Sequence, residues 1–289
     1  MIFGVMANSI IYQQLSGRLG NQLFQWAYSH QLNSKYQCKI IPFHDNSHSI
    51  FGYADNLESL KMECSHLGET KAIHSFGLLL KVLDKLKSHY PKLAKNVENI
   101  FGILRTTNHF EIPSLGRKRP KIVTGFFANW ESVCGIEDIL FNELTQGFKD
   151  VRTHPDLPEK YQVIHARRGD FLELKDTYGV LHSEYYLANI DSKLITFICT
   201  DDKGLAQDIQ SRVKVEKVFG PDDMSPTEAM KLMANASLLL MANSTLSWWA
   251  GFYCSRKGGK VIIPKPFYKI EQNGSLHHPD FIAAPSVFY

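Results

Sequence analysis

Apolar and polar positions along the chain follow two patterns, short apolar runs and longer stretches with helical spacing. The first apolar run covers residues 10–15 and is rich in β-forming side chains. It leads through a glycine turn at residues 17–20 into a helical pattern over about residues 21–32. Because glycine interrupts both kinds of element, this order predicts a strand, a tight turn and a helix.

The second half of the chain repeats this order several times. Strands are predicted at residues 161–166, 194–200, 237–242 and 261–263, and helices at residues 205–213, 224–236 and 243–253. Near-continuous apolar strands that alternate with helices are typical of parallel sheets covered on both faces. We therefore predict an α/β fold.

The length of 289 residues accommodates two such α/β units. A polar, proline-bearing stretch at residues 150–158 is the predicted boundary between them. This boundary gives an N-terminal domain of residues 1–150 and a C-terminal domain of residues 151–289. Residues 45–120, rich in Lys, His and Leu, include helical stretches such as 76–86 but no recognisable chemical motif.

Composition and charge narrow the class of protein. A formal net charge of +3 is too small for the strongly basic face of a nucleic-acid binder, so no nucleic-acid partner is expected. The five cysteines are scattered, without a Cys-x-x-Cys pair, which favours a reducing compartment. The first six residues are too short an apolar run for a signal peptide, and no run has the roughly 18 apolar residues of a membrane span. We expect a cytoplasmic enzyme, and peripheral contact with the inner face of a membrane stays open.

The polar run that follows the strand at 161–166 places two arginines side by side. Arg167 and Arg168 would repel each other and lose hydration unless an anion or a carboxylate balances them, and guanidinium groups match phosphate oxygens. A diphosphate would meet this need. The alternative is that one arginine pairs with Asp170 or another acid and the other is solvated. Gly169 suits a turn with positive φ.

Residues 243–249 follow another buried strand and open a helix. Ser244 and Thr245 can cap this helix or contact phosphate, and both roles are compatible. The adjacent Trp248 and Trp249 are more often core residues than ligand platforms.

Two further polar clusters also follow predicted strands. The glycine turn allows a ligand to approach the backbone closely, although Asn21 and Gln22 can equally cap the next helix. Asp201 and Asp202 can cap a helix or accept N–H groups of a purine.

Motifs for a divalent metal are missing from the sequence. It contains no Asp-x-Asp, no His or Cys group at ligand spacing and no Walker A loop. We therefore expect no metal or other cofactor, and expect positive side chains and helix N-termini to hold a diphosphate.

Taken in order, five clusters resemble the α-1,2-fucosyltransferases of glycosyltransferase family 11. They are residues 17–25, 125–127, 165–171, 200–202 and 243–249. The resemblance implies a GT-B type fold, with two Rossmann-like domains facing a central cleft. It also implies metal-independent, inverting transfer of L-fucose from GDP-fucose to the 2-hydroxyl of a terminal galactoside, and we expect a setting in surface-glycan or O-antigen synthesis. Another linkage or acceptor, or a non-catalytic nucleotide-sugar-binding module, remains an alternative.

The resemblance also implies roles for individual residues. Arg167 is expected at the β-phosphate, either Asp201 or Asp202 at the guanine, and Ser244 and Thr245 at the phosphates. Further donor-binding residues are expected at Gly20, Gln22, His165, Arg168, Asn243, Ser247 and Trp248.

Two expectations concern catalysis itself. The resemblance places Asn21 close to the reacting centre. Asp170 is the acid nearest the arginines, and because an acid beside two guanidinium groups is a poor base, we expect it to orient Arg167. Glu173 and Asp176 remain open as the base.

Overall fold

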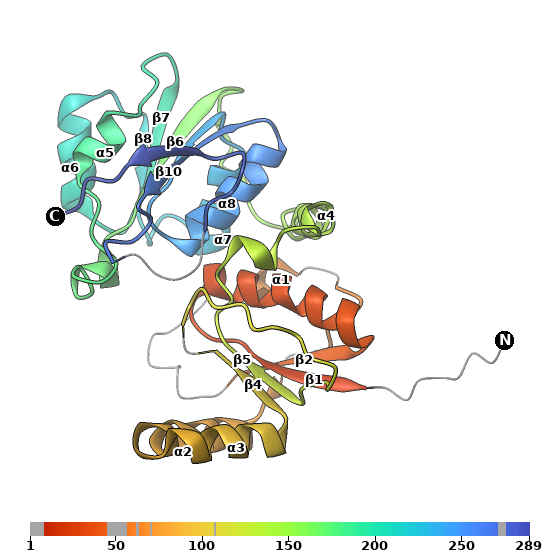
Figure 1. The fold of residues 1–289 in the computed structure, drawn as a ribbon. Coiled ribbons are helices and arrows are strands. Elements are labelled where there is room, and N and C mark those ends of the chain that lie inside the picture. Colours follow the sequence, from red (N-terminus) through yellow and green to blue (C-terminus); the bar gives the residue numbers. More distant parts are fainter. Residues whose placement is uncertain (1–8, 45–56, 62–63, 70, 107, 271–275) are drawn as a thin grey trace. The chain divides into compact units, whose positions relative to one another are not determined.

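The computed structural model describes residues 9–44, 57–61, 64–69, 71–106, 108–270 and 276–289. The chain forms two compact units, the first of residues 1–56 and 63–136, the second of residues 57–62 and 137–289. Within the described residues, none of the helices combines the length and apolar character that crossing a membrane needs. Figure 1 shows both units, each built on its own sheet.

The first unit is built on a five-stranded parallel sheet in the order β3-β2-β1-β5-β4. Its strands are β1 (Ile10–Gln14), β2 (Lys39–His44), β3 (Lys71–Ala72), β4 (Ile103–Arg105) and β5 (Ile122–Thr124). Its helices are α1 (Leu19–Tyr36), α2 (His74–His89), α3 (Pro91–Phe101) and the short 3-10 helix η3 (Trp130–Ser132).

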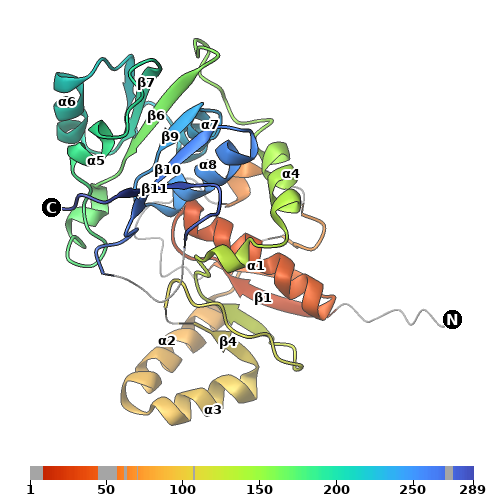
Figure 2. The ribbon, with the colours of Figure 1, turned by 45° about the horizontal axis from the view of Figure 1, so that its top comes forward.

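Helices cover both faces of this sheet, because successive strand residues point to opposite sides. Ile11 packs with Tyr28 and Leu32 of α1 in one buried cluster. The next position, Tyr12, packs against a second cluster that contains Leu80 and Leu83 of α2. Figures 1 and 2 show α1 on one side of the strands and the α2–α3 hairpin on the other.

The second unit is built on a six-stranded parallel sheet in the order β11-β10-β9-β6-β7-β8. Its strands are β6 (Tyr161–Ala166), β7 (Ile195–Thr200), β8 (Lys217–Phe219), β9 (Leu238–Leu240), β10 (Lys260–Lys265) and β11 (Ile282–Pro285). With β6 counted first, the spatial order is 3-2-1-4-5-6, the order of a Rossmann fold.

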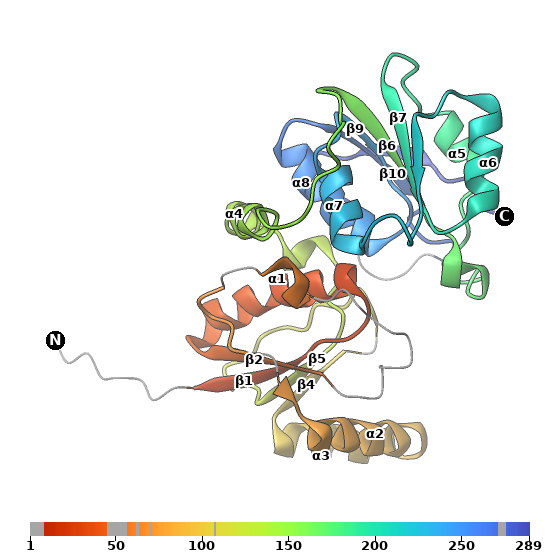
Figure 3. The ribbon, with the colours of Figure 1, turned by 180° about the vertical axis from the view of Figure 1, so that it is seen from behind.

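Helices cover both faces of the second sheet as well. They are α4 (Glu137–Gly147), α5 (Ser183–Leu187), α6 (Lys203–Arg212), α7 (Pro226–Ala234) and α8 (Thr245–Arg256), with the 3-10 helices η2 (Leu57–Leu60) and η4 (Gly169–Leu172). Figure 3 shows α5 and α6 on one side of the strands and α7 and α8 on the other. Tyr186 and Ile209 share a buried core with Ile164 of β6.

The predicted α/β class with parallel sheets is confirmed in both units, and each predicted strand is present. Six further strands among the described residues, β2, β3, β4, β5, β8 and β11, are not predicted from the sequence. β4, β5 and β8 have three residues each, too few to show a period of two.

The units divide after Ile136, earlier than the boundary predicted at residue 150. The reason is α4, which packs on α8 of the second unit. The Phe141 ring lies 4.7 Å from the ring of Tyr253, and the hydroxyls of Thr145 and Tyr253 are 3.1 Å apart. The proline-bearing stretch is therefore a loop within the second unit.

Candidate functional site

The polar clusters of the second unit meet where its strand order reverses. β6 and β9 are neighbours in the sheet, with Ile164 opposite Leu240, and β7 lies on the other side of β6. Residues 165–170, 200–202 and 241–245 follow these three strands. In open parallel sheets, ligands bind outside the carboxyl ends of the strands at this switch point. The structure thus brings together three of the predicted donor-binding clusters.

Arg167 is held by two carboxylates. Its guanidinium donates to Asp170 Oδ1 at 2.5 Å, and its Nε lies 3.4 Å from Asp201 Oδ2. The Arg167 side chain is 18% exposed and that of Asp170 is 43% exposed. Arg167 therefore lies at the surface of the site with a solvent-exposed acid as its nearest partner.

Arg168 is engaged on several sides by the protein itself. Its guanidinium lies 3.3 Å from Asp202 Oδ2 and donates to the Leu181 carbonyl at 3.2 Å. It also donates to the Tyr289 hydroxyl at 2.8 Å and lies 4.6 Å from the centre of that ring. In this structure three carboxylates balance the two guanidinium groups, and binding of a diphosphate stays a prediction. The alternative is wrong in one detail, since neither arginine is simply solvated.

Asp201 holds the turn of residues 167–170, called the arginine turn below. Its Oδ1 accepts the backbone N–H groups of Arg168, at 2.7 Å, and Gly169, at 3.2 Å. A Cβ on Gly169 would lie 2.5 Å from Asp201 Oδ2. Gly169 is therefore needed for close approach, and the expected positive φ is not found there.

Asp202 caps α6, since its carboxylate accepts the Leu205 N–H at 2.9 Å. The capping alternative is confirmed at this position. Both aspartates already have partners within the protein, so a contact of either with guanine stays a prediction.

The N-terminus of α8 lies at the same switch point. Ser244 is the N-cap residue, but its side chain makes no capping hydrogen bond to the helix. The first intrahelical bond runs from Trp248 N to Ser244 O, so the N–H groups of residues 245–247 have no acceptor within the helix. This N-terminus adds a partial positive charge at the switch point.

Four other predicted donor residues are buried supports. Asn243 donates from Nδ2 to the carbonyls of Tyr178 and Gly179, and Trp248 Nε1 donates to the Leu276 carbonyl at 2.6 Å. His165 Nδ1 is hydrogen-bonded to the hydroxyl of the fully buried Ser247. These four side chains form hydrogen bonds on the buried side of the loops. Direct contact with a donor is therefore expected from the other residues of the site.

His165 stays neutral in the folded protein. Burial lowers the pKa of its imidazole to about 3, and the charge of Arg167 acts in the same direction. A neutral ring can accept from, or donate to, Ser247 without adding charge to the arginine turn. His165 therefore links β6 to α8 over the ordinary pH range.

The glycine turn of the first unit lies at the switch point of the other sheet, between β1 and β5. Gly17 has φ +72°, and a Cβ there would lie 2.5 Å from Asn21 Nδ2 and 2.9 Å from the Phe126 ring. The structure thus joins Asn21 to the predicted cluster at 125–127. The helix begins at Leu19, so Asn21 and Gln22 are not its caps, and buried Gly20 lies in its first turn. Gln22 Nε2 instead donates to the Gly17 carbonyl at 2.9 Å.

Gln25 is a central residue of this turn to which no role was assigned from the sequence. Its side chain is fully buried and accepts the Ser16 N–H at 3.0 Å. It also donates to the Gly125 carbonyl at 2.9 Å. Gln25 thereby fastens the loop after β1 to the loop after β5. A buried amide in an otherwise apolar stretch of helix was the signal available in the sequence.

The aromatic contacts around the arginine turn are not predicted from the sequence, although Phe171 lies in the predicted cluster at 165–171. Phe171 stacks on Tyr178 with ring centres 5.3 Å apart, and Tyr178 contacts Tyr268 at 4.8 Å. Tyr289 covers Arg168 from the end of the chain. The contacts of Tyr268 and Tyr289 join residues far apart in sequence, and no spacing rule reveals them.

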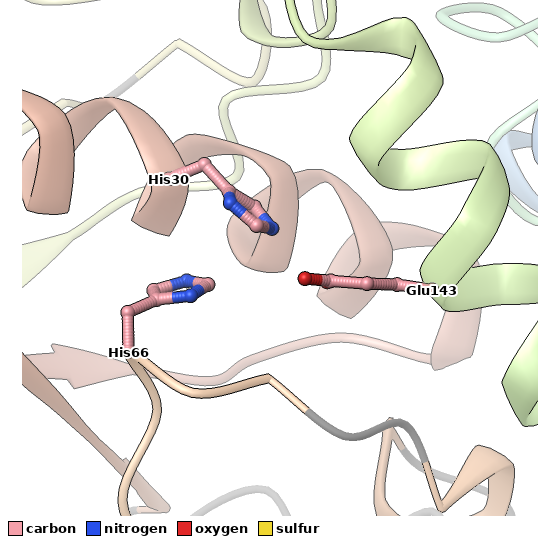
Figure 4. Close-up of side chains that lie close together, drawn as sticks. All are labelled: His30, His66 and Glu143. Atoms are coloured by element: carbon pink, nitrogen blue, oxygen red, sulfur yellow. The ribbon is translucent and has the colours of Figure 1, made fainter.

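Two histidines of the first unit also come together from distant positions. The rings of His30 and His66 have centres 4.1 Å apart, and His66 Nε2 lies 2.6 Å from the hydroxyl of Ser29 (Figure 4). Glu143, also labelled there, belongs to the second unit. Two imidazoles are fewer than the three or four protein ligands of a zinc site, so we assign no metal to this pair.

Sequence comparison identifies similar proteins over nearly the whole chain. The profile of glycosyl transferase family 11 matches residues 10–280. An alpha-1,2-colitosyltransferase of Escherichia coli is 24% identical over 301 residues, which cover 93% of this chain and 96% of that protein.

Solved structures with similar topology are more distant. Fucosyltransferase NodZ from Bradyrhizobium superposes with a TM-score of 0.43 and 10% identity, over 85% of this chain and 93% of that chain. A family 9 glycosyl transferase from Veillonella parvula gives 0.48 and 10%, over 97% and 88%. Heptosyltransferase WaaC of E. coli, solved with ADP, gives 0.44 and 10%, over 89% and 87%.

Replacing Gln25 by Ala should lower the free energy of unfolding by about 2–4 kcal/mol. The loss leaves buried partners at Ser16 and Gly125 unsatisfied, at about 1–3 kcal/mol each. Urea unfolding measures this change. Gln31→Ala, on the same helix but with an exposed bond, is the matched control and should cost less than about 1 kcal/mol. Equal losses would show that Gln25 does not fasten the two loops.

Replacing His165 by Gln should reduce the loss of stability that occurs as the pH falls. The ordinary His pKa is about 6.5 and the folded value is about 3, so below pH 6.5 the unfolded chain gains a proton that the folded chain excludes. Stability should therefore fall with falling pH by about 1.4 kcal/mol per unit on account of this group. The free energy of unfolding is measured between pH 6 and pH 4.5. Most of its dependence on pH should disappear in His165→Gln, but not in the exposed control His89→Gln. An unchanged slope in the first variant would contradict a neutral buried imidazole.

Proposed function

Because the chain belongs to glycosyltransferase family 11, we propose that it transfers L-fucose from GDP-fucose to the 2-hydroxyl of a terminal galactoside, with inversion and without a metal. The 1,2 linkage is supported by the name of the E. coli relative. We propose surface-glycan or O-antigen synthesis as its setting.

The observation that carries this proposal is the arginine turn beside the N-terminus of α8, at the switch point of a Rossmann sheet. Arg167 and the first turn of α8 follow the neighbouring strands β6 and β9. A guanidinium and a helix N-terminus are both suited to a diphosphate. Each such donor, aimed at the negative charge of the departing GDP, would contribute a few kcal/mol to the rate.

Binding of a diphosphate requires one of the carboxylates around Arg167 to give way. Asp201 is unsuited to this, because it also accepts two backbone N–H groups. Asp170 is the more exposed acid and can be rehydrated at little cost. We therefore assign Asp170 as a partner that holds Arg167 in the free enzyme and yields it to the β-phosphate. Asn21, in the other unit, is proposed to act at the reacting centre on the family resemblance alone.

A second donor sugar is suggested by the relative from E. coli. Colitose is fucose without its 3-hydroxyl, so both sugars suit the same leaving nucleotide. Offering GDP-fucose and GDP-colitose in parallel, against β-galactosides of type 1, type 2 and lactose, separates the two donors. NMR of the product reads the linkage, and release of GDP only when a galactoside is present excludes a non-catalytic binding module.

Replacing Arg167 by Ala should lower the rate of transfer about 10²–10³-fold, as expected for loss of a donor to the leaving group. Arg167→Lys keeps the charge but loses the planar fork and should recover only part of the rate. The rate is measured with GDP-fucose and a β-galactoside in EDTA.

Arg212→Ala is the matched control for this experiment. Arg212 lies on the same unit and pairs with Glu184 and Asp208 at the surface. Its variant should retain nearly full activity. Near-normal turnover in Arg167→Ala, or an absolute need of the wild-type enzyme for a divalent cation, would refute the proposed mechanism.

A further inference from the structure

The helical hairpin formed by α2 and α3 exposes apolar side chains that are not part of the buried core. The exposed fractions are 66% for Leu78, 55% for Val82, 64% for Tyr90, 51% for Leu93, 75% for Ile100 and 51% for Phe101. All six residues lie within one 24-residue stretch of the chain. Figure 2 shows the two helices side by side. So many exposed apolar side chains in one hairpin are typical of an interaction surface.

The core of the first unit uses a different face of α2. Leu80 and Leu83 are almost fully buried against the sheet, and Ala94 of α3 is buried too. Leu78, Val82 and Lys85 are spaced four and three residues apart, so they share another face of the helix. This face of α2 is therefore amphipathic, with Leu78 and Val82 as its apolar residues and Lys85 as its charged one.

The charge on the hairpin is strongly positive. It carries five lysines, Lys81, Lys85, Lys87, Lys92 and Lys95, against the two acids Asp84 and Glu98. Glu98 is buried and lies 3.6 Å from Lys95, and Asp84 is paired with Arg105. The excess of three positive charges equals the formal net charge of the whole chain. The basic character of the protein is thus concentrated on the helices that expose the aliphatic residues.

We propose that the α2–α3 hairpin binds to the surface of an anionic lipid bilayer. Exposed Leu, Val and Ile can enter the boundary between headgroups and acyl chains, while lysines on long stems reach the phosphates. Each lysine near an anionic surface contributes about 1 kcal/mol. A nucleic acid would leave the aliphatic side chains without a partner, and a second copy of the chain would bring two sets of lysines together. The inference stands on this surface alone and does not depend on the proposed reaction.

The test is co-sedimentation of the full chain with vesicles. Vesicles of phosphatidylcholine alone are compared with vesicles that contain 30% phosphatidylglycerol, at low and high salt. The wild-type chain should pellet with the anionic vesicles, and high salt should weaken this binding. The double variant Val82→Glu/Ile100→Glu and the charge variant Lys81→Glu/Lys85→Glu should each reduce the bound fraction more than tenfold.

The matched control is Ile139→Glu/Leu172→Glu, which changes two similarly exposed apolar residues of the second unit. It should bind vesicles as the wild type does. Circular dichroism and thermal unfolding confirm that each variant folds. The proposal is overturned if wild-type chain does not pellet, or if the control loses binding as the hairpin variants do. Concentration-dependent dimers of the wild type, dissolved by Val82→Glu/Ile100→Glu without vesicle binding, would assign the surface to a second copy instead.

Discussion

The site in the second unit depends on a balance of charge at the end of β6. Two guanidinium groups face three carboxylates, and each carboxylate has a distinct geometry. Asp202 also caps α6, Asp201 also holds the backbone of the turn, and Asp170 is the exposed partner of Arg167. Asp170 is the most exposed of the three, so it is the acid that we propose an anionic ligand displaces. The arrangement keeps both arginines in place, and Arg167 is the one that we propose binds a phosphate.

Motif residues at this site divide into a surface layer and a supporting layer. Arg167 and the half-buried Thr245 at the start of α8 form the surface layer. His165, Ser247, Trp248 and Asn243 lie behind them, and their hydrogen bonds join β6, α8 and the loops around them. Burial keeps the imidazole neutral, which avoids a third positive charge beside the arginines. Gln25 plays a comparable supporting part in the first unit, between the loops after β1 and β5.

Much of this could be predicted from the sequence, for reasons that differ between elements. Long apolar strands such as β6 and β7 reveal themselves by composition, and the polar runs after them mark the carboxyl ends where a site forms. The partners of Arg168 could not be predicted, because Tyr289 and Leu181 reach it from distant parts of the chain. The local pattern predicts a positive φ at Gly169, whereas the structure needs glycine there for the close approach of Asp201, which no local pattern reveals. The boundary at residue 150 was placed too late because a proline-bearing loop resembles a linker, whereas the packing of α4 on α8 leaves no local trace.

The exchange of Asp170 for a phosphate is tested most directly by titrating GDP into the Asp170→Asn variant and the wild-type chain, in EDTA and at low salt. Removing the competing charge frees Arg167 without disturbing the two amides that Asp201 holds. Calorimetry should therefore show GDP bound several-fold more tightly by the variant, about the value of one exposed ion pair. Weaker or unchanged GDP binding by Asp170→Asn would contradict the account.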